Sequence, residues 1–272
     1  MKSIYSKPNS LFMERLPTLF LSHGSPMLAL ENETTDEYIT ILKNLGRELP
    51  IPKAVLSIGA HWYWPYKQID VSEFPETIYD FYGFPEELYR IKYKAKWYPQ
   101  WAELIQSLIP ELQYEPVQRW LDHGTWSVFM HLFPEAHIPV FCLSIDSRDS
   151  LEEQLELWKK LRVMRDHGIL IVTNWNIVHD LSTADFGLEK NTPYPFASDF
   201  DEDFKKHLFN KEYDALAHPH KLRWWMEAFR TLEHYIPAII TLWTAYPEET
   251  PQTIFEWFEL GSIWRRAFGF GL

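Results

Sequence analysis

Three histidines of this chain stand just beyond short apolar runs. His23 follows "TLFLS", His61 follows "AVLSIGA", and His179 comes shortly after "ILIVT". In open α/β sheets, ligands bind beyond the carboxyl ends of the strands, which is where these imidazoles would lie. Neutral imidazole binds zinc, iron and copper, so their convergence at one sheet edge would indicate a metal site. Taken singly, each histidine could instead be a polar residue that ends a strand and bonds a backbone carbonyl.

The other histidines of the eleven in the chain have different surroundings. His234 precedes the apolar run "AIITLW", and His123 lies between an aspartate and a glycine in "LDHGTW". Directly after His61, Trp62 and Tyr63 could form the wall of an aromatic substrate pocket. Solvated or capping roles are the simpler interpretation for the remaining six, which are His131, His137, His167, His207, His218 and His220.

The sequence lacks the motifs of two other groups of proteins. It contains neither the GxxxxGK[ST] nor the GxGxxG pattern of nucleotide-binding loops. The turn "SHGSP" lacks the GxSxG elbow of serine hydrolases, so Ser25 is not expected to act as a nucleophile.

Short apolar runs rich in β-branched residues predict the strands that must position these side chains. Runs this short and this apolar are typical of strands covered on both faces, as in a largely parallel sheet. The expected strands cover residues 18–22, 54–60, 140–145, 169–173 and 238–243.

Amphipathic patterns between the apolar runs predict helices. Ser150 and Glu153 form a capping box that opens a helix, which Gly168 should end. Other helices are expected from Thr34 to Gly46, from Pro99 onward and from about Ser198 onward. Alternating strands and helices predict an α/β fold, a three-layer sandwich whose central sheet is largely parallel or mixed, with helices on both faces.

The composition indicates a folded globular protein. Hydrophobic residues make up 46% and aromatic residues 17% of the 272 residues. We expect one domain over residues 1–272, with residues 1–15 as a flexible N-terminal extension. The 26 Lys and Arg against 38 Asp and Glu give a net charge of −12, which would repel nucleic acid and anionic membranes.

The compartment is predicted from what the sequence lacks. Cys142 is the single cysteine, so no internal disulfide can form. The chain begins without a signal-peptide pattern, and no stretch approaches the roughly 20 apolar residues of a membrane span. We therefore expect a cytoplasmic protein, and the sequence leaves its oligomeric state open.

Several motifs occur in an order that resembles the class III extradiol ring-cleaving dioxygenases, in particular their DOPA-dioxygenase-like branch. The resemblance extends over most of the chain from about residue 17. The motifs are "LFLSHGSPM", "PKAVLSIGAHWY", "TIYDFYGFPEELY", "LDHGTWSV", "IPVFCLSID", "NIVHDL" and "EHYIPAI". The resemblance implies a non-haem metal enzyme that inserts both atoms of O₂ into a catechol and opens the ring beside the two hydroxyls.

The resemblance also implies roles for five histidines. His23, His61 and His234 match metal ligands, and His179 matches either a fourth ligand in a zinc form or an acid–base group. His123 matches a histidine that faces the substrate, so His179 and His123 are the expected catalytic residues. One divalent metal per chain is implied, with Fe(II) for turnover and zinc in the purified protein.

The sequence departs from the motifs of that family at three places, which include four residues. Tyr82 stands where a small residue is expected, Asn174 and Trp175 stand where a Gly-Ser-Gly-like stretch is usual, and Leu232 stands where proline is common. The first two departures could reshape the substrate pocket, so DOPA itself does not follow as the substrate. The residues expected to bind the substrate are Ser25, Trp62, Tyr63, Tyr82 and Trp175.

Two alternatives to a dioxygenase stay open on the sequence alone. The first is a zinc-dependent hydrolase on the same scaffold, which would use a metal-activated hydroxide and consume no O₂. The second is a non-catalytic metal-binding protein, which would turn over nothing but would lose stability when its metal is chelated.

Overall fold

A mixed sheet of seven strands forms the centre of the molecule. The structure, a computed structural model, describes residues 15–30, 36–96, 100–110, 114–189 and 191–272, so residues 1–14 of the expected N-terminal extension lie outside the described residues. The strand order is β10–β11–β1–β8–β2–β6, and β9 pairs with β11. The strands are β1 (Thr18–Leu21), β2 (Ala54–Gly59), β6 (Val140–Cys142), β8 (Ile169–Asn174), β9 (Val178–His179), β10 (Gln252–Glu259) and β11 (Ile263–Phe270).

The parallel strands at the centre of the sheet end level with one another. β1, β8, β2 and β6 are parallel neighbours, as the apolar runs predict. Leu21 at the end of β1 and Gly59 at the end of β2 both pair with Asn174 at the end of β8. Side chains that follow these three strands therefore start from one edge of the sheet.

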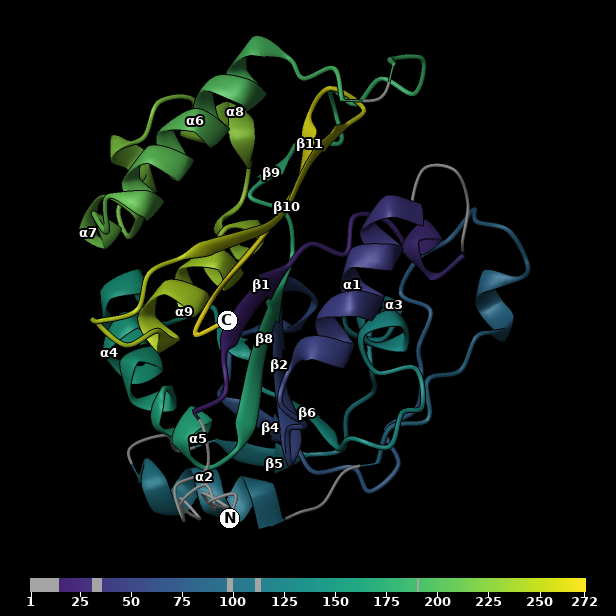
Figure 1. The fold of residues 1–272 in the computed structure, drawn as a ribbon, viewed down its shortest axis with the longest axis vertical. Helices are drawn as coiled ribbons and strands as arrows, with labels where there is room; N and C mark the ends of the chain where they lie inside the picture. Colours follow the sequence, from purple (N-terminus) through teal and green to yellow (C-terminus); the bar gives the residue numbers. More distant parts are fainter. Residues whose placement is uncertain (1–14, 31–35, 97–99, 111–113, 190) are drawn as a thin grey trace, which may run out of the picture.

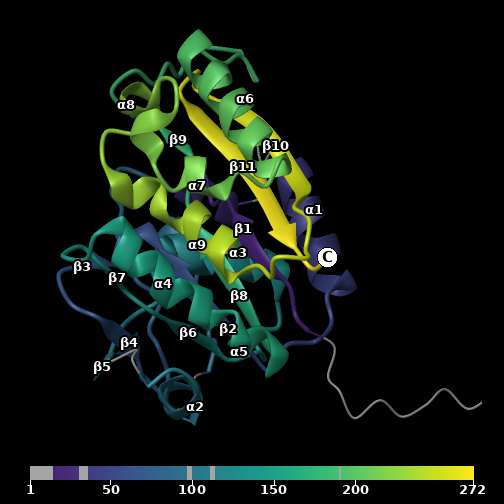
Figure 2. The ribbon, with the colours of Figure 1, turned by 90° about the vertical axis from the view of Figure 1, so that its left-hand side faces the viewer.

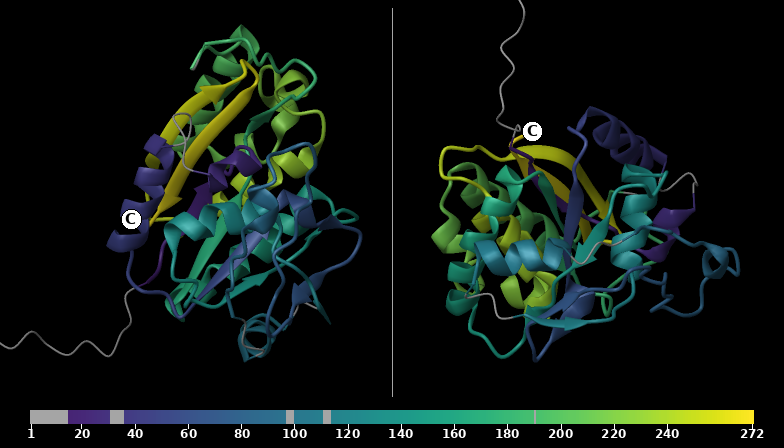
Figure 3. Two further views of the ribbon diagram at one scale, coloured as in Figure 1. Left: turned by 90° about the vertical axis from the view of Figure 1, so that its right-hand side faces the viewer. Right: turned by 90° about the horizontal axis from the view of Figure 1, so that it is seen from below.

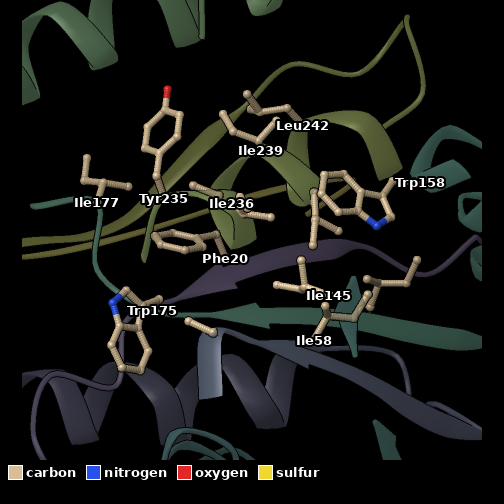
Figure 4. Packing of buried hydrophobic residues seen from close by; sticks show 14 of the residues in the cluster. Phe20, Ile58, Ile145, Trp158, Trp175, Ile177, Tyr235, Ile236, Ile239 and Leu242 are labelled. Carbon is tan, nitrogen blue, oxygen red and sulfur yellow. The ribbon is translucent and has the colours of Figure 1, made fainter. Parts of the chain in front are cut away.

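Helices cover both faces of the sheet, which confirms the predicted α/β sandwich (Figures 1 and 2). Leu19 and Leu21 of β1 pack into one buried cluster, and Phe20 packs into the other, because successive side chains of a strand point to opposite faces. The helices α1 (Asp36–Glu48) and α3 (His123–Leu132) cover the first face. The second face is covered by α4 (Leu151–Leu161), α5 (Val163–Asp166), α6 (Pro195–Phe209) and α9 (Ile236–Thr244). Figure 4 shows part of this second cluster, with Trp175 and Trp158 near opposite ends of the view.

The helix ends agree in part with the expected caps. Ser150 and Glu153 form the predicted capping box of α4, but the helical segment is divided into α4 and α5 before Gly168. The helix expected after Pro99 is α2 (Gln100–Leu108), and Pro195 opens the helix expected near Ser198. Pro99 itself and Thr34 lie outside the described residues.

Gly46 does not end its helix, because α1 continues to Glu48. A Cβ atom at this position would lie only 1.9 Å from the backbone oxygen of Leu132, the last residue of α3. The glycine therefore allows α1 and α3 to approach each other closely.

We expect Gly46→Ala to lower the free energy of unfolding by about 1–3 kcal/mol, because the two helices must move apart. Helix propensity alone would predict the opposite sign, since alanine favours a helix more than glycine does. Urea unfolding of this variant and of Glu48→Ala, an exposed position on the same helix, measures the difference. A stability of Gly46→Ala equal to or above that of the wild type would contradict this account of the helix contact.

One predicted strand is wrong. Residues 238–243 lie within the helix α9, which begins at Ile236 with Pro237 in its first turn and is buried nearly throughout. A short run that is apolar on every side suits a buried strand and a buried helix equally well. His234 therefore precedes a helix, and it lies in the short helix η5 (Leu232–His234).

The C-terminal hairpin of β10 and β11 makes the sheet mixed and was not predicted. β11 runs antiparallel to both β1 and β10, and Leu260 and Gly261 in the turn have φ angles of 52° and 75°. Figure 3 shows the hairpin beside α1.

The remaining elements are short. The run 140–145 is divided between β6 and a second strand, β7 (Ile145–Asp146), which pairs with β3 (Tyr63–Trp64). β4 (Gln68–Asp70) pairs with β5 (Glu115–Val117). The others are η1 (Pro26–Ala29), η2 (Ala60–Trp62), η3 (Leu88–Arg90), α7 (Tyr213–Leu216), η4 (Pro219–Lys221) and α8 (Trp225–Ala228). None of the described helices has both the length and the apolar character needed to cross a membrane.

Candidate metal centre

Three histidines form a compact cluster at the carboxyl edge of the parallel strands. One potential ligand atom from each of His23, His61 and His123 lies within 4.8 Å of the other two, close enough to share a metal ion. The ring centroids are 5.2 Å apart for His23 and His61, 5.0 Å for His23 and His123, and 4.3 Å for His61 and His123.

Each of these side chains is placed by a different element. His23 follows β1 by two residues, and Gly24 then turns the chain with a φ angle of 60°. His61 follows β2 by two residues and lies in η2. His123 is the first residue of α3, whose N-cap is Asp122.

The environment of His23 suits a metal ligand. Its side chain is 1% exposed, and its Nδ1 atom has no hydrogen-bond partner. Burial, together with the neighbouring imidazoles of His123 and His61, lowers the pKa of His23 well below its ordinary value. A buried, neutral imidazole with an unpaired nitrogen is the form that binds a divalent cation.

Two carboxylates hold the other two imidazoles. His61 Nδ1 lies 3.2 Å from Asp80 Oδ2 and 3.4 Å from Asp122 Oδ1, and His123 Nδ1 lies 2.9 Å from Asp80 Oδ1. The hydrogen bond to Asp80 fixes the tautomer of His123 and leaves its Nε2 available to a metal, while His61 Nδ1 lies near both carboxylates without a hydrogen bond. Three imidazoles oriented in this way fit a divalent metal ion.

The acidity of both carboxyl groups reflects these contacts. Burial alone would raise the pKa of Asp122, but the interaction with His61 and the charge of Arg119 bring it down to about 2. Burial alone would also raise the pKa of Asp80, but the hydrogen bond and charge of His123 lower this pKa below its ordinary value. Asp80 was missed in the sequence, where only its nearness to the motif residue Tyr82 could have drawn attention to it.

The other two expected ligands, His179 and His234, form a separate pair. Their rings stack with centroids 4.4 Å apart and an interplanar angle of 20°. Burial, with the neighbouring His234, lowers the pKa of His179 to about 3, and burial, with the nearby His61, lowers that of His234 to about 4. Both rings are therefore neutral at pH 7.

The indole of Trp175 lies between the pair and the cluster of three. Its ring centroid is 4.7 Å from that of His23 and 4.2 Å from that of His61 on one side. On the other side it is 5.3 Å from the ring of His179 and 4.7 Å from that of His234. The structure thus brings the five histidines to one region but divides them into two groups.

Comparison with known proteins assigns the family. Residues 17–224 match the model described as the catalytic LigB subunit of aromatic ring-opening dioxygenase. The chain belongs to this family. It is an extradiol aromatic ring-opening dioxygenase, and the proteins of this family depend on a metal.

Relatives along nearly the whole length support the assignment. The chain is 36% identical over 258 residues to a protein from Escherichia coli K12 named "4,5-DOPA dioxygenase extradiol", with 92% of each chain covered. A protein of the same name from Beta vulgaris is 32% identical, with 84% of this chain and 86% of the relative covered. The crystal structure of an uncharacterized protein from Escherichia coli K12 superposes with a TM-score of 0.80 at 28% identity, covering 94% of this chain and 99% of that one.

Three residues expected at the substrate of this dioxygenase have other contacts in the structure. Ser25 caps η1 by accepting a hydrogen bond of 3.2 Å from the Met27 amide. The buried ring of Trp62 lies 4.6 Å from the Arg119 guanidinium, in a cation–π arrangement. Burial, with the charge of Glu233, raises the pKa of the half-buried Tyr63.

At the next motif it is Phe81, and not its neighbour Tyr82, that reaches the histidines. Tyr82 is 92% exposed. The ring of Phe81 lies edge-on to His123, with centroids 5.5 Å apart. No sequence pattern identifies Phe81, because Asp80 and Phe81 are consecutive residues and both contact His123.

We expect Asp122→Asn to weaken metal binding by about 10–100-fold, because the carboxylate that orients His61 is lost. Asparagine still accepts the hydrogen bond from the Thr125 amide, 3.0 Å away, so α3 keeps its N-cap. Competition with a chromophoric chelator measures the affinity, and Asp214→Asn, at an exposed position of α7, is the matched control. An affinity within twofold of the wild type would show that Asp122 does not support the site.

Proposed function

We propose that this dioxygenase opens the aromatic ring of a catechol with O₂, using one divalent metal ion, Fe(II), bound by His23, His61 and His123. The observation that carries the proposal is the compact cluster of these three imidazoles in a chain of this family. DOPA appears in the names of the relatives and is therefore the reference compound among candidate catechols. The single cysteine, Cys142, favours a reducing compartment such as the cytoplasm.

The bound ion would supply a Lewis acid with open positions for the substrate and, as Fe(II), the redox chemistry that zinc lacks. The protein's own part is to orient the imidazoles and to exclude water from the site. Asp80 orients His123 through a hydrogen bond, and the charges of Asp80 and Asp122 lie beside His61. Phe81 and Trp175 border the cluster with aromatic rings, which suits a flat aromatic substrate.

The stacked pair of His179 and His234 provides the acid–base groups. Burial keeps both imidazoles neutral at pH 7, so either ring can accept a hydrogen bond from a substrate hydroxyl. His234 Nδ1 lies 3.3 Å from Glu233 Oε1, a carboxylate that would stabilise a protonated His234.

The family resemblance favours a different set, in which His234 and His179 join His23 and His61 and leave His123 to face the substrate. The two sets share His23 and His61, so single variants at His123 and His234 distinguish them. We expect His123→Ala to lose the metal, and His234→Ala to retain one equivalent while losing turnover. Elemental analysis of both iron-loaded variants measures the bound metal. Loss of metal in His234→Ala and its retention in His123→Ala would establish the ligand set given by the resemblance.

Oxygen uptake tests the proposed reaction directly. The protein is stripped of metal, reloaded anaerobically with Fe(II) and offered a panel of catechols that includes DOPA. We expect one O₂ consumed per catechol, and no uptake by the zinc-loaded protein. Absence of uptake with every catechol, at one equivalent of bound iron, would overturn the proposal; hydrolysis without O₂ would instead establish a zinc-dependent hydrolase.

A further inference from the structure

Trp175 is the side chain that contacts both histidine groups. Its indole lies edge-on to His61, with an interplanar angle of 88°, and at 65° to His23. It is tilted by 63° from the ring of His234. A substrate ring that reaches both groups must therefore pass along the indole or displace it.

The indole is buried with its polar atom unsatisfied. Trp175 is 7% exposed, and its Nε1 atom has no hydrogen-bond partner. A buried N–H without an acceptor is costly, and tryptophan usually finds a partner for it. An oxygen atom of a bound ligand would satisfy this donor.

The backbone on both sides of Trp175 is held firmly. Asn174 ends β8 in register with Leu21 of β1 and Gly59 of β2. Asn176 is fully buried, and its Oδ1 atom accepts a hydrogen bond from the Ser22 hydroxyl. The indole is thus a wall whose position is fixed by the sheet, and only its side-chain torsions can move it.

We propose that Trp175 sets the size of the substrate: the indole forms one wall of the ring-binding site, donates its N–H to a substrate oxygen, and selects compact catechols over catechols that carry a bulky side chain such as that of DOPA. This inference rests on the proposed function. Pockets that differ by small apolar groups discriminate between substrates by about 10–200-fold, which sets the scale of the effect.

Binding to the zinc-loaded protein tests the inference without turnover, since zinc does not support the redox step. Calorimetry under anaerobic conditions gives the Kd of DOPA and of unsubstituted catechol, and the ratio of the two is the readout. We expect DOPA to bind at least about tenfold more weakly in the wild type, and Trp175→Ala to reduce this ratio by at least about tenfold. Trp175→Phe keeps the wall and loses the N–H, so both ligands should bind about two- to tenfold more weakly at an unchanged ratio.

Trp158→Phe is the matched control, because Trp158 is also buried but lies on the other side of the view in Figure 4. The ratio of the two Kd values in this variant should equal the ratio in the wild type. If Trp175→Ala does not fold, Trp175→Leu keeps more of the apolar volume and allows the same comparison. An unchanged ratio in the smaller variant would overturn the inference alone, while wild-type protein that neither binds a catechol nor consumes O₂ when loaded with iron would overturn the proposed function as well.

Discussion

Replacing His23 with alanine should remove the bound metal and lower kcat/KM for ring opening by at least about a thousandfold, which corresponds to about 4 kcal/mol. His23 belongs to both ligand sets considered above, it is buried, and its Nδ1 atom has no other partner. Removing it leaves at most two of the three imidazoles in the compact cluster. Metal content after anaerobic loading and the rate of O₂ uptake measure the two effects.

His137→Ala provides the control for His23, because His137 is an exposed histidine outside both groups. It should retain one equivalent of metal and wild-type turnover. Circular dichroism of His23→Ala separates loss of the ligand from loss of the fold. A folded His23→Ala protein that still binds one equivalent of iron and opens catechols would show that the metal is bound elsewhere.

Asp201→Asn should lower the free energy of unfolding by about 3–5 kcal/mol, because it removes one of the two carboxylates that pair with a buried guanidinium and sets an amide NH2 against one of its N–H donors. Arg266 on β11 is fully buried, and its Nε and Nη2 atoms each lie 2.7 Å from one carboxylate oxygen of Asp201 on α6. Its Nη1 atom lies 2.7 Å from Glu256 Oε1. A loss of this size is a large part of the 5–15 kcal/mol that stabilises an ordinary domain.

Lys205→Ala is the comparison for Asp201→Asn. Lys205 also pairs with Glu256, but its side chain is partly exposed to solvent, so we expect a change below about 1 kcal/mol. Urea unfolding of the two variants and the wild type gives the free energies. A loss below about 1 kcal/mol in Asp201→Asn would mean that water or another group solvates the Arg266 guanidinium.

The parallel core and the placement of two site histidines could be predicted from the sequence. Short β-branched runs predicted four strands of the sheet, and the rule that polar side chains gather beyond parallel strands placed His23 and His61 at its carboxyl edge. The capping box of Ser150 could also be predicted, because a cap depends on contacts within a few residues.

The features that could not be predicted depend on contacts between distant parts of the chain. Nothing local distinguishes the buried helix α9 from a buried strand, because both are apolar on every side. The approach of His123 and Asp80 to His61 requires α3 and a long loop to pack against the end of β2. The indole of Trp175, between the two histidine groups, likewise could not be placed from its position after β8 alone.

That the extension at residues 1–15 is flexible, and that residues 1–272 form one domain, stay predictions. The sheet and both of its helical layers draw on segments from Thr18 to Phe270, which is the arrangement that a single domain requires.

The fate of the oxygen atoms tests the central claim most directly. Iron-loaded protein is incubated with a catechol under ¹⁸O₂. The product is reduced at once, before its carbonyl oxygen exchanges with water, and its mass is measured by mass spectrometry. We expect a ring-opened product in which both added oxygen atoms are ¹⁸O. A product with one labelled atom or none would contradict it, because the oxygen would then come partly or wholly from water.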